Sequence, residues 1–299
     1  MSEVERSMQQ DWQNIEQQLD SIRAVEGGFS QAQRGLITLA DGSEVFVKVG
    51  SQENTKKWAK KEVAVYRFLE AHHYPHAPRL IATNGEETAF ALEAYTPANG
   101  WDWQENWDED RLAVTIQAME DLAAIELDDD ERSFFSASTI TQDSNGWLPL
   151  LSSAEKQQVL KRKLHGINAE DIVKNIDFAD DAERSKAYQF ADDTLVHYDL
   201  RADNCAWSAT LKQVKIVDWN WTQLGDKDIE LAATLTHIQK SGYDLPAELI
   251  KRLNANALQW MAGFWFNAAA TPIWDGGPEH LRDFQLLAGV TALRLAEQL

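Results

Sequence analysis

The sequence predicts an α+β fold with two lobes, a small β-rich lobe over residues 1–95 and a large, mainly helical lobe over residues 96–299. Two observations predict this division. Strand-like runs of alternating apolar and polar residues concentrate before residue 95, a pattern typical of a half-buried sheet. From Pro97 onward apolar residues recur mostly at helical spacing, with an island of strand-like runs between Thr194 and Trp221. A chain of 299 residues is long enough to form both lobes.

The elements of the first lobe can be placed one by one. The apolar residues from Trp12 to Ile22 recur at helical spacing and predict an amphipathic helix. The pair Asp41-Gly42 is typical of the tight turn of a β-hairpin. The predicted elements are, in order, a helix over residues 8–23, strands over 36–39 and 44–49, a helix over 55–72, and strands over 79–81 and 89–94.

Composition excludes several classes of protein. A net charge of −20 argues against binding to nucleic acid or to an anionic membrane, because both rely on basic surfaces. The single cysteine, Cys205, rules out an intramolecular disulfide and fits a reducing compartment. The N-terminus lacks the pattern of a signal peptide, and the apolar stretch 258–270 is too short to span a bilayer. We therefore expect a cytoplasmic protein without an obligatory protein partner.

One motif carries the chemistry. It is His197-Tyr198-Asp199-Leu200-Arg201-Ala202-Asp203-Asn204, followed by Ile216-Val217-Asp218-Trp219. Phosphoryl transfer needs a carboxylate beside the attacking hydroxyl, oxygen ligands for Mg²⁺ and a cation on the phosphates. Asp199 can supply the carboxylate, Asn204 and Asp218 the metal ligands, and Lys48 the cation. The runs on either side of Leu211-Lys212-Gln213 predict a hairpin that returns Asp218 beside Asn204.

A lysine on a strand and a glutamate on the next helix form a candidate pair. Lys48 ends the alternating run 44–49, on the face opposite to that of the valines. Glu62 falls within the apolar stripe of the helix over residues 55–72. A carboxylate in such a stripe needs a partner, because burying it unpaired is costly. Lys48 is the candidate partner, and a rim position with an exposed carboxylate is the alternative for Glu62.

The motif resembles the catalytic and metal-binding loops of the aminoglycoside phosphotransferase family, within the protein-kinase-like superfamily. The run Gly225-Asp226 with Glu230 also resembles the segment that follows the metal-binding aspartate in this family. The resemblance implies a protein-kinase-like fold of two lobes, with the nucleotide bound in the first and the catalytic loop, metal-binding loop and acceptor site in the second. It implies transfer of the γ-phosphoryl group of ATP, with Mg²⁺, to a hydroxyl of a small molecule. GTP stays open as the nucleotide, because Phe46 stands where kinases often carry a small residue.

The resemblance also implies roles for single residues. Asp199 is the catalytic residue, Asn204 and Asp218 are the metal ligands, and Glu62 holds Lys48 on the phosphates. His197 has a structural role, its ring bonded to nearby backbone. The residues that the resemblance further assigns to nucleotide binding are Gly27, Gly28 and Ser30 in the loop over the phosphates, and Glu93 and Tyr95 in the connector between the lobes.

Two alternatives to a small-molecule kinase are a protein kinase and a nucleotide-binding pseudokinase that acts as a regulator. Tyr198 replaces the arginine of regulated protein kinases, and Asp218-Trp219 is followed by too short a segment for an activation loop. Both features disfavour a protein kinase. The presence of Lys48, Glu62 and the three polar residues of the motif disfavours a pseudokinase.

The acceptor is not identified by the sequence. Trp101, Trp103 and Trp107 alternate with acidic residues up to Asp110, a combination that suits a cationic acceptor such as an aminoglycoside or an amino alcohol. The alternative is that these aromatic side chains belong to the core, which is their commoner place.

Overall fold

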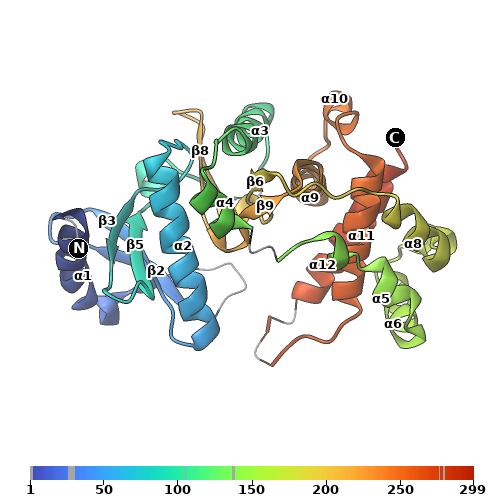
Figure 1. Ribbon diagram of the computed structural model, residues 1–299, viewed down its shortest axis with the longest axis horizontal. Helices are drawn as coiled ribbons and strands as arrows, with labels where there is room; N and C mark the ends of the chain where they lie inside the picture. The colour runs from blue at the N-terminus through green and yellow to red at the C-terminus, as the bar shows by residue number, and fades with distance from the viewer. Residues whose placement is uncertain (1–2, 26–30, 105, 137–138, 276, 279) are drawn as a thin grey trace. The chain divides into compact units, whose positions relative to one another are not determined.

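The computed structural model describes residues 3–25, 31–104, 106–136, 139–275, 277–278 and 280–299 (Figure 1). The chain forms two compact units, each built from separate stretches. Unit 1 comprises Met1–Gln104, Asp108–Ile125 and Ala202–Thr222, and unit 2 comprises Glu105–Trp107, Glu126–Arg201 and Gln223–Leu299. The motif 197–204 therefore belongs to both units, with the division after Arg201. The lobe boundary after residue 95 stays a prediction.

Unit 1 contains a five-stranded antiparallel sheet in the order β1-β2-β3-β5-β4. The strands are β1 (Arg23–Ala24), β2 (Gln33–Thr38), β3 (Glu44–Val49), β4 (Leu80–Thr83) and β5 (Ala89–Glu93). The hairpin predicted around Asp41-Gly42 joins β2 to β3, with Ile37 opposite Val45. Its turn is stabilised because Asp41 Oδ1 accepts a hydrogen bond of 2.9 Å from Ser43 N and because Gly42 supplies the positive φ of 85°.

Two helices cover the two faces of this sheet (Figure 1). The first, α1 (Glu3–Glu16), buries Trp12 and Ile15 in a core with Val45 and Val47 of β3. The second, α2 (Glu53–Ala71), lies on the opposite face, where Lys48 points. The alternation of side chains along β3 thus separates an apolar face from the face that carries the lysine.

The first helix is shorter than its apolar spacing predicts. It ends at Glu16, and a 3₁₀ turn, η1 (Leu19–Ser21), follows. The chain then pairs with β2, with Arg23 opposite Leu36, and this pairing competes with continuation of the helix. Leu19 and Ile22 still pack against the core of α1. Helical spacing therefore predicted the contact correctly but not the backbone conformation.

The rest of unit 1 comes from later in the sequence. Its elements are η2 (Pro97–Asn99), α3 (Glu109–Ala123), η4 (Ala202–Asn204), the hairpin strands β7 (Cys205–Ser208) and β8 (Gln213–Ile216), and η5 (Trp219–Trp221). Cys205 lies opposite Ile216 in the hairpin. The strand-like island between Thr194 and Trp221 is confirmed, and the last strand of this region, β9, lies just beyond it.

Unit 2 is mainly helical, with the two-stranded sheet of β6 (Thr194–Val196) and β9 (Gln223–Gly225). Helices α11 and α12 lie side by side in it (Figure 1). Trp147, Trp260 and Phe266 are fully buried in its core. Its helices are α4 (Asp129–Phe135), α5 (Trp147–Leu151), α6 (Ala154–Gly166), α7 (Glu170–Asn175), α8 (Phe178–Lys186), α9 (Lys227–Lys240), α10 (Ala247–Ile250), α11 (Ala255–Ala269) and α12 (Leu281–Ala296), with the 3₁₀ turn η3 (Gln142–Ser144).

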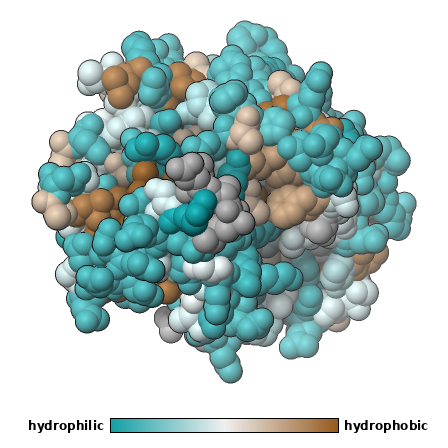
Figure 2. All heavy atoms as spheres, turned by 60° about the vertical axis from the view of Figure 1, so that its left-hand side comes forward, coloured by the Kyte–Doolittle hydropathy of each residue, from teal (hydrophilic) through white to brown (hydrophobic). Residues whose placement is uncertain are grey.

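The surface agrees with the strongly acidic composition. Figure 2 shows that hydrophilic residues cover most of the face in view, with hydrophobic side chains in separate small areas. Among the residues that the structure describes, no helix has both the length and the apolar character needed to cross a membrane.

Candidate active site

A buried lysine is the centre of the site in unit 1. Lys48 at the end of β3 is only 5% exposed, and Glu62 of α2 is 2% exposed. Lys48 Nζ lies 2.5 Å from Glu62 Oε1 and 2.9 Å from Asp218 Oδ1. The structure thus brings together three of the predicted site residues. A buried ammonium with two carboxylates is a costly arrangement that a fold rarely keeps for stability alone.

The electrostatic balance keeps this lysine charged. Burial disfavours the ammonium form, but the carboxylates of Asp218 and Glu62 outweigh burial and raise the pKa of Lys48 above its usual value. Burial raises the pKa of Glu62 as well, and the charge of Lys48 opposes that rise. At neutral pH the site therefore holds a cation whose position is set by two acids.

The hairpin of β7 and β8 brings Asp218 back to Asn204, as the sequence pattern predicts. Val217 N donates a hydrogen bond of 3.0 Å to Asn204 O. The side chain of Asn204 is buried, and Asp218 adopts the left-handed conformation with φ of 65°. A non-glycine residue in this region is strained, and such strain concentrates at functional sites. Asn220 Nδ2 donates a hydrogen bond of 2.7 Å to Asp218 Oδ1, which fixes the carboxylate further.

The part of the predicted catalytic loop that lies in unit 2 places Asp199 against an arginine. Arg201 Nε donates to Asp199 Oδ1 at 2.9 Å, and Arg201 Nη2 donates to Asp199 Oδ2 at 3.3 Å. This two-pronged contact holds the carboxylate in one orientation. Asp199 N donates to His197 Nδ1 at 3.2 Å, so the ring of His197 bonds to backbone and carries its proton on Nε2 when neutral.

Glu230 anchors the same loop, a role that its sequence position does not reveal. Its Oε1 accepts hydrogen bonds from His197 N at 2.6 Å and from Tyr198 N at 3.1 Å. Burial raises the pKa of Glu230 to about 7, although the two backbone donors oppose the rise. The sequence places Glu230 in the first turn of α9, where it complements the helix dipole. The sequence does place this acid beside the apolar residues Ile229 and Ala233, which are buried. A carboxylate in such surroundings needs a partner, and this argument, which singled out Glu62, could have indicated a role for Glu230 as well.

Tyr198 occupies the strained position of this loop, with φ of 62°. Its hydroxyl accepts a hydrogen bond of 2.6 Å from Asp226 N. The ring packs on Gly225, where an added Cβ would lie 2.4 Å from the Tyr198 hydroxyl oxygen. The loop therefore accommodates a tyrosine in a glycine-like conformation because the facing residue has no side chain.

Replacing this glycine should destabilise the loop. We expect Gly225→Ala to lower the free energy of unfolding by about 1–3 kcal/mol, because the methyl group must displace the Tyr198 ring. Gly166→Ala at the end of α6 is the matched control, since an added Cβ there meets no atom within 4 Å. Urea unfolding of both variants measures the difference. Equal stability of the two variants would show that the ring moves aside without cost.

The other predicted residues have partners of their own in unit 1. Tyr95 Oη donates a hydrogen bond of 2.9 Å to Glu93 Oε2, and Trp103 Nε1 donates one of 2.7 Å to Tyr95 O. Glu93 is at the end of β5, the strand that pairs with β3. The predicted phosphate loop with Gly27, Gly28 and Ser30 lies outside the described residues.

The sequence matches the phosphotransferase enzyme family over residues 21–264. The chain belongs to this family. It is therefore a phosphotransferase of the small-molecule kinase type, and the alternatives of a protein kinase and a regulator without activity are not supported. No curated protein has a significant sequence match to it.

Solved structures confirm the protein-kinase-like fold of the phosphotransferase. The spectinomycin phosphotransferase APH(9)-Ia, in complex with ADP and spectinomycin, is 12% identical with a TM-score of 0.58, over 96% of this chain and 98% of that chain. The choline kinase LicA from Streptococcus pneumoniae is 12% identical with a TM-score of 0.52, over 97% and 98%. An ethanolamine kinase from Plasmodium vivax is 13% identical with a TM-score of 0.50, over 93% and 82%. Identities this low show a common fold and no more.

The residues of the phosphotransferase fit a magnesium ion. Among the described residues no three His, Cys, Asp or Glu side chains cluster as a metal site. Mg²⁺ needs no such cluster, since it is usually bound by one or two protein oxygens together with phosphates and water. Asp218 and Asn204 offer those oxygens, and the buried Asn220 Oδ1 beside them has no hydrogen-bond partner among the described residues. A hydrated cation would satisfy such an acceptor.

Several residues of the acidic and aromatic segment 101–110 of the phosphotransferase make structural contacts. Trp101 is 6% exposed, and the backbone of Asp102 pairs with Trp207 through two hydrogen bonds of 2.8 Å. Asp108 caps α3, and Asp110 lies 2.6 Å from Lys212 Nζ. These contacts give Trp101, Asp102, Asp108 and Asp110 structural roles that require no bound acceptor.

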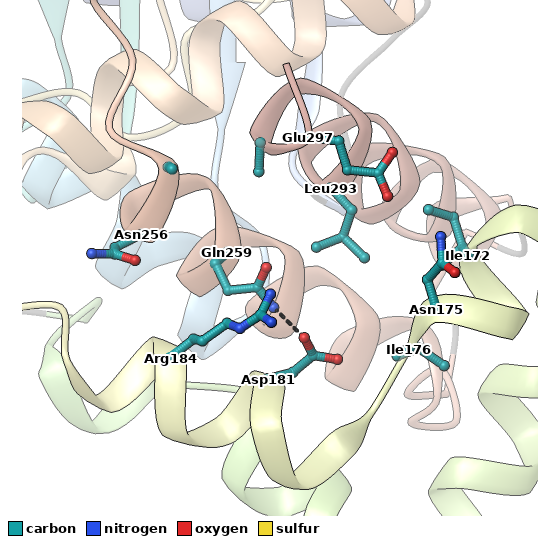
Figure 3. A pocket seen from close by; sticks show the side chains of 11 residues that line it. Ile172, Asn175, Ile176, Asp181, Arg184, Asn256, Gln259, Leu293 and Glu297 are labelled. Carbon is teal, nitrogen blue, oxygen red and sulfur yellow. Dashed lines mark hydrogen bonds between the residues drawn. The ribbon is translucent and has the colours of Figure 1, made fainter. Parts of the chain in front are cut away.

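One pocket of the phosphotransferase is lined by none of the predicted site residues (Figure 3). It belongs to unit 2, has a volume of about 230 Å³, and is lined by parts of α7, α8, α11 and α12. Asp181 Oδ1 accepts a hydrogen bond of 2.9 Å from Gln259 Nε2 at its edge (Figure 3). Burial raises the pKa of Asp181 to about 6. Two protein donors, Gln259 and the backbone of Asp177, already bind this carboxyl group, so its burial is accounted for by structure.

Proposed function

We propose that this phosphotransferase transfers the γ-phosphoryl group of ATP to a hydroxyl of a small molecule in a magnesium-dependent reaction. The observation that carries the proposal is Lys48, a buried cation held between Glu62 and Asp218. This arrangement places a fixed positive charge beside Asp218, the candidate metal ligand. The phosphates of a nucleotide need both a cationic side chain and a metal ion to balance their negative charge. GTP is the alternative nucleotide.

The residues of unit 1 would bind the nucleotide. Lys48 would contact the phosphates, and Glu62 would keep its ammonium group in place. Asp218 and Asn204 would hold Mg²⁺. This ion, when bound, would neutralise part of the negative charge of the phosphates. Glu93 and Tyr95, in the predicted connector between the lobes, remain proposed nucleotide-binding residues.

The residues of unit 2 would position the acceptor. Asp199 would accept a hydrogen bond from the attacking hydroxyl and so orient its oxygen. Because Arg201 binds both carboxylate oxygens, the carboxylate of Asp199 is held in one orientation, which suits it to positioning the hydroxyl. His197 and Glu230 would keep the loop in its conformation.

The small size of the acceptor agrees with the names of the structural relatives, which act on spectinomycin, choline and ethanolamine. The cationic acceptor stays a prediction of the sequence. The structural contacts of Trp101, Asp102 and Asp110 weaken the observation on which that prediction rests.

Removal of one metal ligand tests the proposal. Asp218→Ala should abolish magnesium-dependent ATP binding, and Asn204→Ala should weaken it less, because a carboxylate brings a full charge to the ion and an amide only a dipole. Titration calorimetry with ATP, in Mg²⁺ and in EDTA, measures both variants. The control is Asp192→Ala, which removes an exposed carboxylate near the catalytic loop. Unchanged affinity for magnesium ATP in Asp218→Ala would refute the metal assignment.

A further inference from the structure

A buried tyrosine lies beside the proposed metal site of unit 1. Tyr66 of α2 comes one helical turn after Glu62, so the two side chains lie on the same face of the helix. Helix α2 packs against η5, the turn that begins directly after Asp218. The ring of Tyr66 is 1% exposed, and its centroid lies 5.9 Å from that of the Phe90 ring. Phe90 is opposite Lys48 in the pairing of β5 with β3, so the tyrosine is held near this lysine.

The hydroxyl of Tyr66 is shielded from solvent and has no hydrogen-bond partner among the described residues. A buried polar atom without a partner is costly, and most such atoms in folded proteins are paired. Burial, followed by the charges of Glu62 and Asp218, raises the pKa of this hydroxyl well above its usual value, while the backbone amide of Asp218 opposes the rise. The hydroxyl therefore stays protonated and lies beside the amide of Asp218 without meeting it at hydrogen-bonding geometry.

A second buried tyrosine of unit 1 provides a comparison. Tyr74 Oη donates a hydrogen bond of 2.9 Å to Ala118 O, and its ring meets that of Trp219 edge-on at a centroid distance of 5.8 Å. The hydroxyl of Tyr74 thus has a structural partner, whereas that of Tyr66 lies next to Asp218 without one. Packing alone would be served as well by phenylalanine at position 66, so the hydroxyl of Tyr66 needs another explanation.

The proposed function indicates when this hydroxyl would gain a partner. In this structure Asp218 Oδ1 accepts hydrogen bonds from Lys48 Nζ at 2.9 Å and from Asn220 Nδ2 at 2.7 Å. The phosphates of a nucleotide would compete for Lys48, and the carboxylate of Asp218 would then turn to the metal ion. Asp218 has a φ of 65°, a strained conformation that its surroundings must maintain. A group that binds its backbone during this exchange would keep the carboxylate directed at the ion.

We propose that Tyr66 is a positioning residue for Asp218, whose backbone N donates a hydrogen bond to Tyr66 Oη when magnesium and nucleotide are bound. This inference rests on the proposed function, since it concerns the metal site of that reaction. In this role the hydroxyl contacts neither the ion nor the nucleotide and acts through Asp218. Its burial without a partner is the cost of keeping it ready for the bound state. Tyr66 therefore raises the affinity for the magnesium complex of the nucleotide.

The first test measures affinity by titration calorimetry of the full chain with ATP, in Mg²⁺ and in EDTA. Tyr66→Phe should weaken ATP binding about fivefold in Mg²⁺, the loss expected for one intramolecular hydrogen bond. In EDTA the change should stay below about twofold, because the hydroxyl acts through the residue that holds the ion. Tyr74→Phe is the matched control, since it removes the same atom from a buried tyrosine that has another partner. It should change neither affinity more than about twofold.

The second test measures stability in the absence of nucleotide, which separates a positioning role from a structural one. Tyr66→Phe should leave the midpoint of urea unfolding unchanged or raise it, because the substitution removes a polar atom that has no partner. Tyr74→Phe should lower the midpoint, because the carbonyl of Ala118 loses its donor. The two variants should therefore show opposite patterns, with a loss of affinity in one and a loss of stability in the other.

Three results would overturn the proposal. The first is an unchanged affinity of Tyr66→Phe for ATP in Mg²⁺. The second is an equal loss of affinity in EDTA, which would mean that the hydroxyl contacts the nucleotide itself. The third is a fall in the urea midpoint as large as that of Tyr74→Phe, which would mean that the hydroxyl is paired without nucleotide. Failure of the proposed function looks different, since wild-type protein would then bind ATP no better in Mg²⁺ than in EDTA, and both proposals would be wrong.

Discussion

Asp199→Asn should reduce turnover by about 10²–10⁴-fold, the range in which a positioned acid or base contributes to catalysis. The substitution keeps the shape of the side chain but removes the charge and replaces one acceptor oxygen by an NH₂ group. In this structure that NH₂ group would face a donor of Arg201, since Arg201 donates to both oxygens of Asp199. The hydroxyl of the acceptor would then lose both its partner and the fixed orientation of that partner.

Binding and turnover must be measured together for this variant. The affinity for magnesium ATP should stay close to that of the wild type, because the proposed nucleotide ligands all belong to unit 1. Asp192→Asn is the control, since it removes an exposed carboxylate seven residues earlier in the chain and should leave turnover within about twofold. Turnover near the wild-type rate in a folded Asp199→Asn variant would show that another group orients the hydroxyl.

Lys48→Met should both abolish most turnover and destabilise the fold. Breaking a buried ion pair by removing one partner costs about 3–5 kcal/mol, because the remaining charge stays buried without compensation. Here two carboxylates, those of Glu62 and Asp218, would lose their common partner. Urea unfolding measures the stability, and consumption of ATP measures the activity.

A double-mutant cycle isolates the contact. Lys48→Met combined with Glu62→Gln should cost less stability than the two single changes added together, because the second change removes the charge that the first left uncompensated. The exposed pair Lys251 and Glu248 on the surface is the control, and its cycle should give a coupling below about 1 kcal/mol. Strictly additive losses for Lys48 and Glu62 would mean that their ion pair has no energetic role.

The pH dependence of the single variant follows from the same contact. Burial already raises the pKa of Glu62, and removal of Lys48 removes the main opposing charge. In Lys48→Met the carboxyl group of Glu62 then binds a proton more tightly in the folded state than in the unfolded state. The free energy of unfolding of this variant should therefore fall as the pH rises and recover as the pH is lowered. Wild-type protein should show a weaker recovery over the same interval, because Lys48 opposes the rise in the pKa of Glu62.

Much of the site could be predicted because its signals are local. Asp199 and Asn204 are five residues apart, and the spacing of their motif is independent of how the rest of the chain folds. The hairpin that returns Asp218 to Asn204 follows from two short strand-like runs around a turn. Glu62 stood out because a single acid interrupts an apolar helical stripe, which requires a nearby cation whatever the fold.

Periodicity was less informative where strand pairing competes with helix formation. The spacing from Trp12 to Ile22 is helical throughout, yet α1 ends at Glu16 and Arg23 pairs with β2. The apolar pattern reports which residues face the core, and a turn followed by a strand can present the same residues as a longer helix. The end of the helix therefore depended on a partner strand that the pattern does not contain.

The sequence by itself determined the family, the chemistry and the residues of the motif, because these depend on residue type and on spacing within short segments. Only the tertiary structure decided which distant residues meet. Lys48 contacts Asp218 across 170 positions of the chain. Glu230 proved to hold the backbone of His197, and Arg201 proved to contact both Asp199 and the ring of Phe284. Such contacts depend on how whole helices and strands pack against one another. The spacing of residues along one helix or strand specifies which residues share a face, but it does not specify which other element packs on that face.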